Sequence, residues 1–78
     1  MKITITMKLL QSNESFDLQV SDSQKIVDTL RILKDNLPMF RVIEETGHVK
    51  EKDSGRIIST EFTYAQAHLY SGNELLIK

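Results

Sequence analysis

Apolar and polar residues alternate strictly near the start of the chain. From residue 2 to residue 9 the odd positions are apolar and the even positions are Lys or Thr, the period of a strand with one buried face. The alternation resumes with Phe16, Leu18 and Val20. Residues 11–14 lie between the two runs and are rich in turn formers. The pattern therefore predicts an N-terminal β-hairpin.

After residue 20 the period of the apolar positions becomes helical. Four apolar residues recur at the spacing of a single helix stripe: Ile26, Leu30, Leu33 and Leu37. Ser21 and Gln24 have the spacing of a capping box, and Pro38 disfavours helical structure at and before its own position. We therefore expect an amphipathic helix over about residues 23 to 36.

The middle of the chain is less regular. Residues 39–43 fit a strand, an extension of the helix or a packed loop, and we expect the packed loop. Residues 48–52 and 56–60 lie on either side of an Asp-Ser-Gly turn at 53–55. We therefore expect a second, short hairpin, whose Lys-rich first strand suits an edge or one-sided position in a sheet.

The C-terminal third predicts a compact helical turn over residues 64–69, a positive φ at Gly72 and a last strand with Leu75 and Ile77. If this strand lies parallel to the first one, across the helix, every apolar stripe is buried at once. The order ββαββ, with a short helical turn before the last strand, thus predicts an α+β, β-grasp fold with a mixed sheet of about four to five strands on one helix. A ferredoxin-like half and a small roll use similar elements.

Composition limits the chemistry available to the protein. The chain has no Cys among its 78 residues, which excludes disulfides, zinc ribbons, iron–sulfur clusters and thiol nucleophiles. Ten Lys and Arg against eleven Asp and Glu give a net charge of -1, too little field to attract nucleic acid or anionic lipid. We expect a single domain over residues 1–78, in the cytoplasm and without membrane insertion, because the sequence shows neither a signal peptide nor a long apolar run.

The candidate catalytic groups are few and scattered. His48 and His68 have no ligand spacing around them, and Gly47, Gly55 and Gly72 are too far apart for a phosphate-binding loop. The serines occupy expected turns and caps and lack the context of a nucleophile elbow. We therefore expect a protein that is not an enzyme and holds no cofactor or metal.

Four segments of the sequence carry a resemblance to known proteins: residues 16–22, 25–28, 56–59 and 69–77. Through them the whole chain resembles ubiquitin and, more closely, the YukD/EsaB family of small bacterial ubiquitin-like proteins associated with type VII secretion systems. Asn73 stands where the family commonly has Asp, and residues 38–47 depart most from it. The resemblance implies a ubiquitin-like fold and a non-enzymatic accessory or regulatory protein. It also implies protein partners, with membrane components of the secretion system among them.

Two other function classes use the same fold. Ubiquitin and sulfur carriers react through a flexible Gly-Gly tail, whereas this sequence ends in Leu-Ile-Lys at 76–78, so we expect neither conjugation nor sulfur transfer. A β-grasp module that binds a small ligand or nucleic acid is the other alternative, and nucleic-acid stacking needs aromatics exposed in a basic groove. Acidic residues interleave with the basic ones of the second hairpin, and Phe16 and Phe62 are expected in the core.

A protein-binding surface is then the remaining candidate site, and six residues are proposed for it: Met39, Phe40, Ile43, Lys50, Leu76 and Lys78. By similarity to ubiquitin, the last three fall on the open side of the sheet. Two of these three are charged, so we do not expect ubiquitin receptors to bind. The first three either complete the core or form a docking patch, and we expect core completion. Lys residues on the short hairpin would discourage edge pairing, which predicts a monomer or weak dimer.

Overall fold

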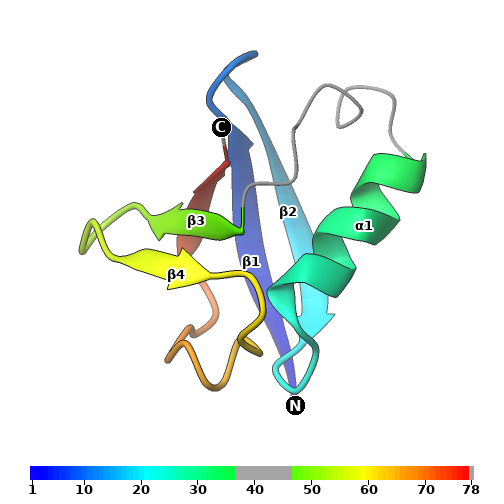
Figure 1. Ribbon diagram of the computed structural model, residues 1–78, viewed down its shortest axis with the longest axis vertical. Coiled ribbons are helices and arrows are strands. Elements are labelled where there is room, and N and C mark those ends of the chain that lie inside the picture. Colours follow the sequence, from blue (N-terminus) through cyan, green and yellow to red (C-terminus); the bar gives the residue numbers. More distant parts are fainter. Residues whose placement is uncertain (37–46, 78) are drawn as a thin grey trace.

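The computed structural model describes residues 1–36 and 47–77. This part of the chain forms a five-stranded mixed sheet and a helix (Figure 1). The elements are β1 (Lys2–Leu9), β2 (Glu14–Ser21), α1 (Ile26–Asn36), β3 (His48–Glu51), β4 (Ile57–Ser59) and β5 (Glu74–Ile77). The predicted hairpins, helix and last strand are therefore confirmed. Residues 39–43 lie outside the described residues.

The strand order is β2-β1-β5-β3-β4. β1 pairs antiparallel with β2 and parallel with β5, so that Met7 lies opposite Leu75. The short hairpin of β3 and β4 is added antiparallel to the other side of β5. The predicted β-grasp arrangement is confirmed. β3 is an inner strand with one exposed face, which agrees with a one-sided position and not with an edge; β2 and β4 form the edges.

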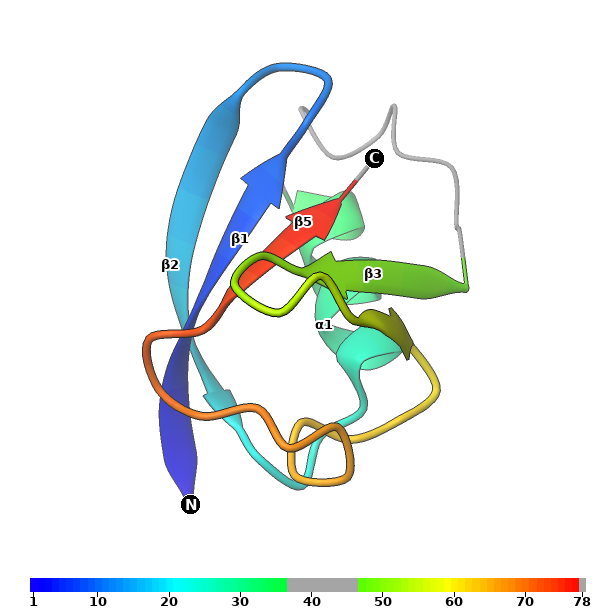
Figure 2. The same cartoon turned by 90° about the vertical axis from the view of Figure 1, so that its left-hand side faces the viewer.

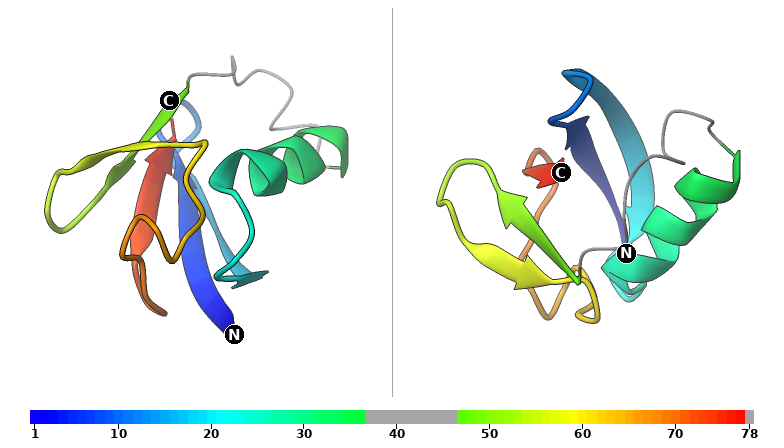
Figure 3. Two further views of the ribbon diagram at one scale, coloured as in Figure 1. Left: turned by 60° about the horizontal axis from the view of Figure 1, so that its bottom comes forward. Right: turned by 45° about the horizontal axis from the view of Figure 1, so that its top comes forward.

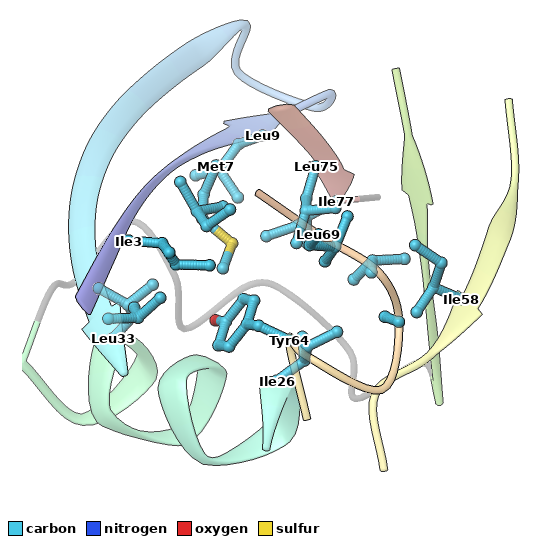
Figure 4. Close-up of a cluster of buried hydrophobic side chains, with 14 residues drawn as sticks. Ile3, Met7, Leu9, Ile26, Leu33, Ile58, Tyr64, Leu69, Leu75 and Ile77 are labelled. Atoms are coloured by element: carbon cyan, nitrogen blue, oxygen red, sulfur yellow. The ribbon is translucent and has the colours of Figure 1, made fainter. Parts of the chain in front are cut away.

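The core lies between the sheet and α1, which packs on one side of the sheet (Figure 3). The inward side chains of β1 and β5 meet those of the helix and of the segment before β5 (Figure 4). Ile5, Met7 and Leu75 are 0% exposed. Each aliphatic side chain buried in this way contributes about 1.5–3 kcal/mol, and the alternation in the sequence places them all on one face.

Residues 60–73 close one end of the core. They form hydrogen-bonded turns between β4 and β5, with Tyr64, Ala67 and Leu69 buried. The Tyr64 hydroxyl donates to Thr29 Oγ1 of α1 at 2.9 Å, and burial raises the pKa of Tyr64 to about 12. The compact turn was predicted, as was the positive φ of Gly72, which is 96°. The hydrogen bond between Tyr64 and Thr29 was not predicted.

The predicted start of the helix near residue 23 is wrong, because α1 begins at Ile26. Ser21 and Gln24 do not form a capping box; they form a separate turn, with the Gln24 amide donating to the Ser21 carbonyl at 3.0 Å. The amides of the first two helical residues donate to the carbonyls of Phe62 at 3.0 Å and Thr60 at 2.8 Å. A neighbouring loop therefore satisfies two of the four amide donors that have no partner within the helix.

Phe62 was expected in the core, and this expectation is wrong, since Phe62 is 48% exposed. The Phe62 carbonyl accepts a hydrogen bond from the Ile26 amide, and this bond fixes the backbone at this position. The fully buried aromatic ring of this segment is that of Tyr64. Phe16, also expected in the core, is partly buried and packs against the core cluster.

Candidate protein-interaction face of the sheet

In the described part of the chain, α1 packs on one face of the sheet and no helix packs on the other, which we call the open face. In Figure 2 strands β1, β5 and β3 lie in front of the helix. Along β1 the side chains that alternate with the buried ones are polar: Lys2, Thr4, Thr6 and Lys8. The open face is thus built by the polar half of the same alternation that forms the core.

The strand register aligns one outward residue from each of four adjacent strands. Lys8 lies opposite Leu76, Leu76 opposite Lys50, and Lys50 opposite Ile57. These four residues form a line across β1, β5, β3 and β4, which we call the cross-strand row. Leu76 and Lys8 are half-buried, Lys50 is exposed, and Ile57 is 65% exposed. The row alternates cation and aliphatic side chain.

The two lysines of the cross-strand row have no carboxylate within ion-pair distance among the described residues. Within residues 1–36 and 47–77, neither Lys8 nor Lys50 forms an ion pair. The acidic groups on the neighbouring line of the same face are already engaged: Asp17 accepts the Thr6 hydroxyl at 2.6 Å, and Glu74 pairs with the Lys52 ammonium at 3.5 Å. The row therefore presents positive charge beside exposed apolar surface.

A buried carboxylate holds β3 in place behind this row. Glu51, 3% exposed, accepts the Ser54 amide at 2.7 Å and the Ser54 hydroxyl at 3.0 Å on Oε2. Its Oε1 accepts the Asn73 side-chain amide at 3.3 Å. The hydrogen bond from the Ser54 backbone N–H, assisted by the other donors, lowers the pKa of Glu51 despite its desolvation. Glu51 thus ties the β3–β4 turn to the residue that precedes β5.

Asn73 lies between a hydrogen-bond donor and a hydrogen-bond acceptor, and its contacts give a physical reason for an amide side chain here. Its side-chain oxygen accepts the Tyr70 amide at 2.6 Å while its side-chain nitrogen donates to Glu51. An Asp at this position would keep the first bond but place a second carboxylate against Glu51. An amide is therefore the side chain that satisfies both neighbours.

Two of the six proposed surface residues lie together: Lys50 and Leu76 are direct cross-strand partners on the open face. Met39, Phe40, Ile43 and Lys78 lie outside the described residues. The sequence reasoning did not include Lys8 and Ile57 in the surface. The outward position of Lys8 was readable from the alternation, whereas the adjacent Ile57 and Ile58 left open which of the two faces outward. The alignment of Lys8 and Ile57 with Leu76 and Lys50 depends on strand register, which the sequence alone also left open.

The described residues contain no group of three or more His, Asp or Glu side chains arranged to hold a metal ion. His48 and His68 are both exposed, on different elements. No helix in residues 1–36 and 47–77 combines the length and apolar character needed to cross a bilayer. What the open face offers chemically is a surface of lysine and aliphatic side chains.

No family model and no curated protein matches the chain. Solved structures do match it. The C-terminal ubiquitin-like domain of mouse tubulin-specific chaperone e matches with a TM-score of 0.68 at 16% identity, over 97% of this chain and 84% of that one. The EccD5 ubiquitin-like domain from Mycobacterium xenopi matches with a TM-score of 0.66 at 15% identity, over 100% and 93%. A designed protein based on ubiquitin gives 0.74 at 18%, over 99% and 87%.

At these identities the likeness extends to the fold alone. The chain therefore has a ubiquitin-like β-grasp fold, as its sequence pattern predicted. Because one fold of this kind supports many functions, the function has to be argued from the surface.

Proposed function

We propose that this protein is a non-enzymatic, ubiquitin-like accessory protein of a bacterial type VII secretion system. It acts in the cytoplasm by binding another protein through the open face of its sheet. The observation that carries the proposal is the pairing of Lys50 with Leu76 on a sheet face that α1 leaves uncovered. The resemblance to the YukD/EsaB family supplies the secretion system, with its membrane components as candidate partners.

A binding role is also supported by where the shifted ionisable groups lie. Glu51 and Tyr64 are both buried and both bound to neighbouring side chains, so they serve the packing of the domain. The cross-strand row, by contrast, places aliphatic side chains beside lysines at the surface of the domain, where a partner can reach them. The EccD5 domain shares this fold, and its 15% identity limits that comparison to the fold.

Site-specific photo-crosslinking in the source strain tests the proposal. A photoreactive amino acid replaces Ile57 on the open face or, as a matched control, Ile32 on α1; both isoleucines are exposed, at 65% and 55%. We expect position 57 to capture a component of the secretion machinery and position 32 to capture none.

Substrate export gives the functional readout. A deletion strain should lose export and recover it with the wild-type gene, but not with Lys50→Glu. Normal export in the deletion strain, or equal crosslinks from positions 57 and 32, contradicts the proposal.

A further inference from the structure

β2 is the longer and less protected of the two edges of the sheet, and it lies beyond β1 at the margin of Figure 2. Its eight residues, Glu14–Ser21, pair with β1 one for one without a bulge and include no Lys, Arg or Pro. The opposite edge, β4, has three residues and follows Arg56. The lysines expected to discourage edge pairing lie on the β3 side of the sheet, away from β2. β2 is therefore an edge that can accept another strand.

The main-chain groups of alternate residues in β2 point away from the sheet. In β1 the even-numbered residues bond on the β5 side, since the amides of Thr6 and Leu10 donate to carbonyls there at 3.0 and 2.8 Å. The odd-numbered residues of β1 therefore bond to β2, and their partners in β2 are even-numbered. Asp17 and Gln19 direct their amides and carbonyls outward, where these groups have no partner within residues 1–36 and 47–77.

The sequence of β2 is complementary to itself in one antiparallel register. When two copies pair about a two-fold axis at Leu18, Asp17 of each lies opposite Gln19 of the other, and their outward main-chain groups form four hydrogen bonds. On the side of α1, Leu18 then meets its own copy and Phe16 meets Val20. All three apolar residues of the strand thus face apolar residues.

The neighbouring registers are poorer. A two-fold axis at Asp17 places two carboxylates directly opposite each other, and an axis at Gln19 places Phe16 opposite Asp22. An axis between two residues sets outward main-chain groups against inward ones and reverses the faces of one strand. The register centred on Leu18 is therefore the favoured one.

The packing of β2 points to the same register. Phe16 and Leu18 pack against the core but are partly buried, because no described strand lies beside them on their outer side. Leu18 lies opposite Ile5, which is 0% exposed on the inner face of β1. Pairing about Leu18 joins the apolar rows of two domains into one continuous row and removes further apolar surface from water.

We infer that the β2 edge is where two copies of this chain associate, by antiparallel pairing about a two-fold axis at Leu18. The axis is perpendicular to the sheet, so the two five-stranded sheets become continuous and both helices lie on one side. The inference goes beyond the proposed function and does not depend on it. Two strands of eight residues make a small interface, which gives a Kd of about 10 to 1,000 μM.

Charge changes at residue 19 test the register. Sedimentation equilibrium of the full chain at concentrations up to about 1 mM measures the Kd. We expect Gln19→Glu, which sets a carboxylate opposite Asp17, to raise the Kd about tenfold, because each dimer contains this pair twice. Gln19→Lys should lower it by a similar factor. Gln11→Glu and Gln11→Lys, in the exposed turn before β2, are the matched controls and should leave the Kd within about twofold.

The absence of Cys from the chain allows a second measurement of the register. A single Cys replaces Asp17, Leu18 or Gln19, and disulfide formation in a glutathione redox buffer is followed by non-reducing electrophoresis. At position 18 the two Cα atoms lie about 4.5 Å apart, within the disulfide range, whereas positions 17 and 19 face each other and not their own copies. We expect Leu18→Cys to cross-link fastest. Thermal unfolding verifies that each variant is folded.

A wild-type chain that stays monomeric at about 1 mM overturns the inference and leaves the edge to a strand of another protein. The inference also fails if the Kd ignores the charge at residue 19, or if Gln11→Glu weakens association as much as Gln19→Glu does. Fastest cross-linking at position 17 or 19 overturns the register on which the inference is built.

Discussion

The two faces of the sheet are built from the same strands and differ in almost every physical respect. Leu75 and Leu76 are neighbours in β5; the first is 0% exposed beneath α1, and the second lies half-buried between two lysines on the open side. Close packing against α1 buries the side chains of the inner face, whereas strand register sets which side chains are neighbours on the outer face. Changes on the inner face should therefore act on stability, and changes on the outer face should act on binding.

The largest difference between the faces should appear within β5. Leu75→Ala leaves a cavity between the sheet and the helix and should lower the free energy of unfolding by about 3 kcal/mol. Leu76→Ala removes the same atoms from the open face and should cost about 1 kcal/mol or less. Urea denaturation of both variants measures the contrast, and equal losses would show that the outer face is also part of the core.

A smaller inner-face effect is expected at the bond between the closing loop and the helix. Tyr64→Phe removes the hydroxyl that binds Thr29 Oγ1 and leaves that buried atom without its donor, at a cost of about 1–2 kcal/mol. Tyr70→Phe, at a tyrosine that is 68% exposed, is the matched control and should change stability little. Adding Thr29→Val to Tyr64→Phe should recover part of the loss. A double variant less stable than the single one would argue against this hydrogen bond as the cause.

Behind the outer face, the buried carboxylate should make stability depend on pH. The folded state lowers the pKa of Glu51 from its ordinary value of 4.5, so its contribution is present above that pH and is lost as the pH falls through the folded pKa. Glu51→Gln should be less stable than wild type at pH 7, and the difference should shrink on acidification toward pH 3. Thermal unfolding across this range measures it. A difference that persists unchanged to pH 3 would indicate lost packing instead.

The smallest effect on stability, combined with a large effect on binding, is expected at the exposed end of the cross-strand row. Ile57→Ser should change the free energy of unfolding by no more than about 0.5 kcal/mol, because the side chain is 65% exposed. The amount of the secretion component that copurifies with the tagged protein should nevertheless fall, whereas Ile32→Ser on α1 should leave this capture unchanged. Equal capture by both variants would remove Ile57 from the interface.

Much of the fold was predictable because its signals are local. The alternation along β1 identified its buried face, and Gly72 marked the positive φ before β5. The helix start was missed because the Phe62 and Thr60 carbonyls, which bind its first amides, are far from it in sequence. Of the candidate surface, Lys50 and Leu76 were found by likeness to ubiquitin. Their neighbours in the row were not, since no local signal marks a register.

The sequence by itself determined which side of β1 and of β2 is apolar, the order of the elements and the absence of cysteine chemistry. The tertiary structure alone decided that Lys8, Leu76, Lys50 and Ile57 stand in one line, and that a polar Glu51 is accommodated in the interior. The physical reason is the range of the interactions. Periodicity acts within a strand, whereas cross-strand pairing and burial of a carboxylate depend on groups that only the completed fold brings together.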